Sequence, residues 1–225
     1  MGLLDLIFPK KCLECKKEGK YICSECLEKL PPLGQICPLC KRASIDGFTH
    51  PKCLKKRGLN GLVSLWPYKG VIRRSIIFLK YKFVKEISRE LSIYVLEKTK
   101  DHFLFKKVEG LITIVPLYWI RKNLRGYNQV EEIAFELAKR FDFRYVGDLI
   151  IRKKYRDPQV SLSKKERVKN VRGVFALNSK YKDILSNAFI IVVDDVFTTG
   201  STLKEMAKVL KRSGAKSVWG LTIAR

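Results

Sequence analysis

Two adjacent carboxylates, Asp194 and Asp195, end an apolar stretch and are followed by hydroxyl groups clustered around one glycine. The cluster leads into a pattern typical of a helix. Backbone N–H groups and hydroxyls at a helix N-terminus favour phosphate, both as donors and through the helix dipole. A glycine among them allows close approach or a positive φ. We therefore expect a phosphate to bind at five residues: Thr198, Thr199, Gly200, Ser201 and Thr202.

The two aspartates need a different role, because a phosphate would repel them. Carboxylates can accept hydrogen bonds from neighbouring hydroxyls of a sugar, so the whole segment is predicted to bind a ribose 5-phosphate. A Walker loop is a weaker alternative, since no lysine follows Gly200. A response-regulator receiver carries its acidic pair near the start of the domain and lacks the Thr/Gly cluster. A purely structural pair would be costly to bury without partners.

A second group of reactive side chains lies near the N-terminus, where all seven cysteines precede residue 54. They form three Cys-x-x-Cys pairs, and His50-Pro51-Lys52-Cys53 makes a fourth pair. This spacing lets two side chains converge on one tetrahedral ion, and zinc suits thiolate and imidazole ligands. We expect two closed, structural zinc sites, but whether neighbouring pairs share an ion or interleave is left open. The predicted ligands are Cys12, Cys15, Cys23, Cys26, Cys37, Cys40, His50 and Cys53.

The chain divides into two predicted domains. Residues 1–58 hold the zinc ligands and are too few to bury a large core, so zinc is expected to be required for their folding. In residues 59–225, apolar strand patterns alternate with helical ones, which predicts an α/β domain with a mostly parallel sheet flanked by helices. Ligands of such sheets bind beyond the carboxyl ends of the strands, where the two aspartates stand. Strands are expected at 61–68, 111–115, 146–151, 188–193 and 217–223, the last closing the sheet, and helices within 71–98 and at 129–141 and 202–213.

The charge balance points to an anionic partner. Lys and Arg number 46 against 22 acids, a net charge of +24. Such a surface attracts nucleic acid, anionic lipid or phosphorylated small molecules, although a solvated lysine-rich surface is the alternative. No segment has the roughly 20 apolar residues of a membrane helix. We expect a cytoplasmic protein, in which the thiols stay reduced.

The segment Ile190–Thr202 resembles the phosphoribosyl pyrophosphate (PRPP) signature of type I phosphoribosyltransferases. It has four apolar residues, two acidic residues, two variable residues and a Thr/Gly-rich loop. Together with other motifs in order, it makes nearly the full chain resemble the ComF/GntX family. Those motifs are the cysteine pairs, Val115-Pro116-Leu117, Arg121-x-x-x-Arg125-Gly126-Tyr127-Asn128-Gln129, Gln159-x-x-Leu162-Ser163-x-x-x-Arg167-x-x-Asn170-Val171-Arg172-Gly173-x-Phe175 and Leu221-x-x-Ala224-Arg225.

The resemblance implies a type I phosphoribosyltransferase-like domain behind a double zinc ribbon. It implies that Pro116 and Leu117 begin the loop that binds pyrophosphate, and that residues 153–172 match the segment that closes over the site. Mg²⁺ would bridge the ribose hydroxyls and the pyrophosphate, held mainly by ligand oxygens and water. The catalytic candidates are Asp194, Asp195, Arg121, Arg125 and Arg167.

The chemistry implied is displacement of pyrophosphate at the anomeric carbon of PRPP, which favours an enzyme. Thr198 stands where purine-salvage relatives often have an acidic base, so purine salvage is disfavoured and the acceptor stays open. The ComF resemblance also implies a role in natural competence, the handling of incoming single-stranded DNA with the membrane uptake machinery as partner. The alternatives are a phosphoribosyltransferase of nucleotide metabolism and a regulator that senses PRPP.

Overall fold

The computed structural model describes residues 9–81, 85–106, 109–117, 128–153 and 173–225. Its centre is a five-stranded sheet with the order β1-β7-β6-β2-β3, in which every neighbouring pair is parallel. The strands are β1 Gly61–Trp66, β2 Leu111–Ile114, β3 Arg144–Tyr145, β6 Phe189–Val196 and β7 Ser217–Ala224. A separate antiparallel pair consists of β4 Ile150–Arg152 and β5 Phe175–Leu177.

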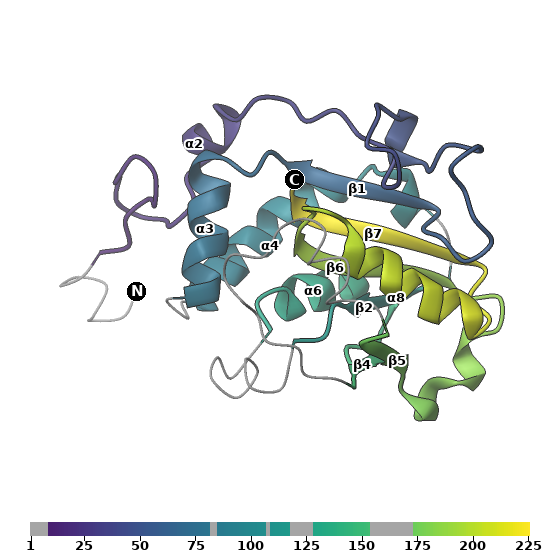
Figure 1. Ribbon diagram of the computed structural model, residues 1–225. Coiled ribbons are helices and arrows are strands. Elements are labelled where there is room, and N and C mark those ends of the chain that lie inside the picture. The colour runs from purple at the N-terminus through teal and green to yellow at the C-terminus, as the bar shows by residue number, and fades with distance from the viewer. Residues whose placement is uncertain (1–8, 82–84, 107–108, 118–127, 154–172) are drawn as a thin grey trace.

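Helices cover both faces of the sheet (Figure 1). Ile191 and Val193 of β6 belong to the same core as α3, α4 and α6, whereas Ile190 and Val192 pack with α8. This alternation follows from the period of two residues in a strand. The longer helices are α3 Gly70–Tyr81, α4 Lys85–Thr99, α6 Glu131–Phe141 and α8 Ser201–Arg212. The short ones are α2 Ser24–Glu28 and the 3-10 turns η1 Ile45–Gly47, η2 Phe103–Phe105, η3 Ser179–Tyr181 and η4 Asp183–Leu185.

The predicted α/β class with a mostly parallel sheet is confirmed, but two details of the prediction were wrong. The expected strand 146–151 is not continuous, because β3 ends at Tyr145 and β4 begins at Ile150 in the other sheet. A turn joins them, in which Leu149 N–H donates to Val146 O at 3.4 Å. The last strand, β7, does not close the sheet but lies inside it, between β1 and β6. The expected strand 188–193 extends to Val196 and so includes both aspartates.

The cysteine-rich region runs along α3 and the edge strand β1 (Figure 1). The Gln35 side chain donates to Ser64 O at 2.9 Å and accepts from Ser64 N–H at 3.0 Å, which satisfies backbone groups of that edge. Thr49 N–H donates to Asn60 O at 2.8 Å just before the strand begins. The N-terminal region therefore covers one edge of the parallel sheet. The boundary between residues 58 and 59 stays a prediction.

Candidate functional site

Asp195 is held in place by two polar side chains that sequence reasoning did not select. Lys80 Nζ of α3 lies 2.8 Å from Asp195 Oδ2, and Gln129 Nε2 donates to the same oxygen at 2.7 Å. The side chain of Asp195 is 10% exposed and that of Lys80 is 25% exposed. An ion pair combined with a hydrogen bond offsets the cost of placing this carboxylate in a largely buried position.

Asp194 points to the opposite face of β6 and has a different environment. Its Oδ1 accepts a hydrogen bond from the backbone N–H of Asp195 at 2.9 Å. Burial, and then the neighbouring Asp195 carboxylate, raise the pKa of Asp194 to about 7. The two aspartates therefore differ: Asp195 has a cationic partner, whereas Asp194 changes its protonation close to neutral pH.

The segment after the aspartates turns sharply into α8. Gly200, the residue before the helix, has φ 75° and ψ 7°, and a Cβ there would lie 2.5 Å from the Phe197 ring. Thr199 Oγ1 and Ser201 Oγ are 2.9 Å apart, and Ser201 N–H donates to Thr199 Oγ1 at 3.3 Å. Thr199 caps the N–H of Ser201, and Lys204 N–H donates to Gly200 O at 2.9 Å, which leaves the N–H groups of Thr202 and Leu203 to face an anion. We call residues 197–202 the phosphate loop.

The predicted pyrophosphate segment begins beside the aspartates. Pro116 and Leu117 are half-buried and follow β2, which pairs with β6. Val115 N–H donates to Val193 O at 3.1 Å, and Asn128 Nδ2 donates to Val115 O at 3.0 Å. The structure thus brings 116–117, 194–195 and 198–202 to the carboxyl ends of two neighbouring strands. The predicted Arg121, Arg125 and Arg167 lie outside the described residues.

The predicted metal ligands gather into two groups, which decides the pairing that the sequence left open. Within each group the ligand atoms all lie within 4.8 Å of one another, and neighbouring pairs share a group. In the second group Cys40 Sγ is 3.4 Å from His50 Nδ1, and the other ring nitrogen, Nε2, is 3.0 Å from Ala43 O. Such a contact orients a ligating imidazole. The first cluster is Cys12, Cys15, Cys23 and Cys26, and the second cluster is Cys37, Cys40, His50 and Cys53.

Both clusters fit tetrahedral zinc, because each offers four convergent thiolate or imidazole atoms. No other group of three or more such ligands occurs in the described parts of the chain.

A lysine beside the second cluster contacts the phosphate loop. Lys41, directly after Cys40, donates from Nζ to Thr198 O at 3.1 Å, and Nζ lies 6.0 Å from the centre of the Phe197 ring. No sequence signal pointed to Lys41, because Lys41 and Thr198 are 157 positions apart. Gln129 did stand in one of the family motifs, although without an assigned role, and nothing marked Lys80.

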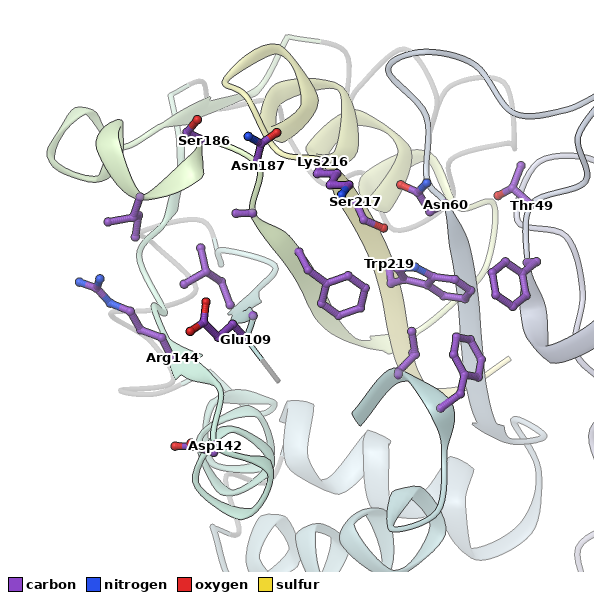
Figure 2. A pocket seen from close by; sticks show the side chains of 18 of the residues that line it. Thr49, Asn60, Glu109, Asp142, Arg144, Ser186, Asn187, Lys216, Ser217 and Trp219 are labelled. Carbon is purple, nitrogen blue, oxygen red and sulfur yellow. The ribbon is translucent and has the colours of Figure 1, made fainter. Parts of the chain in front are cut away.

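Two cavities formed by described residues differ in their place on the fold. A cavity of about 670 Å³ borders the phosphate loop and runs between α8 and the second cluster. A cavity of about 1110 Å³ lies at the amino ends of the strands, near Glu109, Ser217 and Trp219, away from the aspartates (Figure 2). Across the described ranges, we find no helix with the length and apolar character to cross a membrane.

Known proteins are similar to this chain in sequence. Competence protein F of Haemophilus influenzae is 30% identical to this chain over 224 residues, which cover 95% of this chain and 90% of that protein. The chain belongs to the ComF family of competence proteins. In this ComF-family chain, residues 3–54 match the double zinc ribbon domain and residues 131–224 match the phosphoribosyl transferase domain.

Other relatives of this ComF-family protein are named for DNA utilization. The DNA utilization protein YhgH of Salmonella typhimurium is 29% identical over 204 residues, which cover 88% of this chain and 87% of that protein. Among solved structures, that of an allosteric regulatory enzyme of purine biosynthesis is similar over 60% of this chain and 25% of that one. Its identity is 17% and its TM-score is 0.38.

Proposed function

We propose that this ComF-family protein binds PRPP or a ribose 5-phosphate, together with Mg²⁺, at the carboxyl ends of β2 and β6. The observation that carries the proposal is the order of groups along the chain: two carboxylates, then a turn at a left-handed Gly200, then a helix N-terminus. A sugar with neighbouring hydroxyls and a terminal phosphate needs acceptors and donors in that order.

Each part of the site has a separate task in this proposal. Residues 198–202 hold the 5-phosphate, and Asp194 and Asp195 accept hydrogen bonds from the ribose hydroxyls. Lys80 and Gln129 fix the Asp195 carboxylate through Oδ2. Pro116 and Leu117 begin the segment that holds the pyrophosphate, to which Arg121, Arg125 and Arg167 contribute positive charge. Bound Mg²⁺ would neutralise the pyrophosphate and so favour its departure.

The biological role follows from the relatives and from the charge. Relatives are named for competence and for DNA utilization, and this chain carries a net charge of +24. We propose that the protein handles single-stranded DNA during natural competence, beside the membrane uptake machinery, with zinc in purely structural roles. The cytoplasmic location, in which the thiols would stay reduced, remains part of this proposal.

Thermal unfolding of the zinc-loaded protein, with and without PRPP and Mg²⁺, tests whether PRPP binds. A ligand at 100 times its dissociation constant stabilises the native state by about 2.7 kcal/mol. For a chain of this size, that raises the unfolding midpoint by about 5–10 °C. The rise should vanish in the Asp194→Asn/Asp195→Asn variant and persist in an Asp101→Asn/Asp183→Asn variant, which changes two exposed carboxylates elsewhere. No rise in the folded wild type with intact PRPP would overturn the proposal.

A further inference from the structure

The cavity between α8 and the second cluster is a basic groove. One carboxylate, Glu205, lines it, against six cationic side chains: Lys52, Lys55, Arg57, Lys204, Lys208 and Arg212. In the larger cavity, at the amino ends of the strands, the charges balance, with Glu109 and Asp142 against Arg144 and Lys216 (Figure 2). Of these two cavities, formed by described residues, the groove beside the phosphate loop is the one with the surplus positive charge that matches a chain of phosphates.

Charges within the groove do not cancel this surplus. Glu205 already pairs with Lys208 at 2.9 Å and accepts from Gly173 N–H at 3.0 Å. In the described residues no carboxylate forms an ion pair with Lys204 or Arg212, or with the three cations contributed by the zinc-binding region. An anionic ligand would supply the missing counter-charges.

The cations on α8 form a row that starts at the phosphate loop. Lys204, Lys208 and Arg212 are spaced by four residues, so they lie on one face of the helix at intervals of about 6 Å. Ser201 and Thr199 stand at the loop end of the same groove, whereas neither Asp194 nor Asp195 lines it. A free ribose 5-phosphate needs only the loop and the two aspartates, whereas a row of cations fits a ligand that continues beyond the 5-phosphate.

This layout fixes the direction of such a ligand. If the loop takes a 5′-phosphate and the aspartates take the sugar hydroxyls, the groove receives what is attached on the 5′ side. A nucleotide inside a strand would also bring its 3′-phosphate against Asp194 and Asp195, and like charges there repel. A nucleotide at the 3′ end presents a free hydroxyl to the same carboxylates instead.

We propose that the groove and the phosphate loop together bind the 3′ end of a single-stranded nucleic acid, with its 5′ portion lying along α8. This inference rests on the ribose 5-phosphate site proposed above. The last nucleotide occupies that site, so PRPP and the strand exclude each other. PRPP then acts as a regulator that releases the strand end.

Fluorescence anisotropy of the full zinc-loaded chain tests this with a short single-stranded DNA labelled at its 5′ end. The oligonucleotide ending in a 3′-hydroxyl should bind about tenfold more tightly than the same oligonucleotide ending in a 3′-phosphate. Mg²⁺ and PRPP should displace it. The Lys204→Ala/Arg212→Ala variant should bind about tenfold more weakly. Its salt slope should be smaller by about 1.4, since each phosphate contact contributes about 0.7 for a single strand.

A Lys139→Ala/Arg140→Ala variant is the matched control, because it removes two exposed cations from α6 and should leave binding unchanged. Equal affinity for the two 3′ ends, or no displacement by PRPP, would overturn the inference. If PRPP still raises the unfolding temperature in that case, the proposed ribose phosphate site survives and only the strand-end inference fails. If PRPP neither stabilises the protein nor displaces DNA, both fail.

Discussion

The two clusters of predicted zinc ligands begin with the same local structure. Each begins with a Cys-x-x-Cys-Lys turn, whose lysine is left-handed: Lys16 has φ 67° and Lys41 has φ 63°. In the first turn Lys16 N–H donates to Cys12 O at 3.0 Å, and in the second Lys41 N–H donates to Cys37 O at 2.9 Å. The same residue spacing has thus produced the same turn twice.

Their surroundings differ. Next to the first cluster, Ile22 is fully buried, its N–H donates to Glu90 Oε2 at 2.9 Å, and its carbonyl accepts from Tyr94 OH at 2.9 Å. Both partners belong to α4. The second cluster lies against the edge of the sheet, and its Lys41 contacts the phosphate loop. One cluster therefore anchors the N-terminal region on helices, whereas the other also forms a wall of the candidate site.

Removal of one zinc ligand from either cluster should have the largest effect. Cys12→Ser and Cys37→Ser should each lower the zinc content from two to one per chain. Structural zinc is worth about 10–16 kcal/mol in zinc-finger peptides, so we expect each variant to lose several kcal/mol of stability. Metal analysis and calorimetric unfolding measure both effects. At a temperature where both variants are folded, only Cys37→Ser should lose PRPP affinity. Equal losses of affinity in the two variants would contradict a special role of the second cluster at the candidate site.

The pH dependence of stability should be specific to the phosphate side. The pKa of Asp194 is raised from 3.8 to about 7, so the native state keeps a proton that the unfolded chain releases between those values. The stability contributed by this proton is full below about pH 4 and is lost as pH rises through about 7. We expect a loss of a few kcal/mol at most.

Unfolding midpoints of wild type and Asp194→Asn at pH 5 and pH 8 measure this contribution. The wild type should lose more stability between the two pH values than Asp194→Asn, because asparagine does not titrate. Parallel changes in the two proteins would contradict the raised pKa.

Two glycines with positive φ, one near each region, allow the cost of backbone strain to be distinguished from a distortion of the phosphate loop. Gly19, near the first cluster, has φ 113° and open space where a Cβ would lie, whereas a Cβ at Gly200 would lie 2.5 Å from the Phe197 ring. Alanine at either position costs about 1–2 kcal/mol of backbone strain. Only Gly200→Ala should also distort the phosphate loop and weaken PRPP binding severalfold. Calorimetric titration of both variants measures this, and a Gly19→Ala variant with equally weak binding would refute the difference.

The sequence was sufficient to predict which side chains gather into two clusters, but not how those clusters dock on the rest of the chain. Four pairs with the same spacing identify the ligands, because each turn depends on neighbouring residues alone. Which pairs share an ion, and that Lys41 meets Thr198, depend on how the N-terminal region packs on the sheet. Neither residue spacing nor hydrophobic periodicity carries that information.

Within the sheet, one predicted strand was correct and another was wrong, because hydrophobic periodicity reports local pattern alone. The apolar run before Asp194 predicted a buried strand correctly, since few other structures accept such a run. The apolar residues around Val146 and Ile150 looked like one strand, yet Gly147 and Asp148 form a turn from one sheet into the other. Periodicity in a short apolar run does not reveal a change of sheet.

The claim that the second cluster, but not the first, helps to build the phosphate site is tested most directly by comparing Lys41→Ala with Lys16→Ala. The two lysines have the same backbone conformation, so any strain introduced by the substitution is matched. Calorimetric titration with PRPP and Mg²⁺ should show binding to Lys41→Ala weakened about fivefold, the effect of losing a hydrogen bond worth about 1 kcal/mol. Lys16→Ala should bind like the wild type. Equal affinities for the two variants would contradict a phosphate site that the second cluster helps to build.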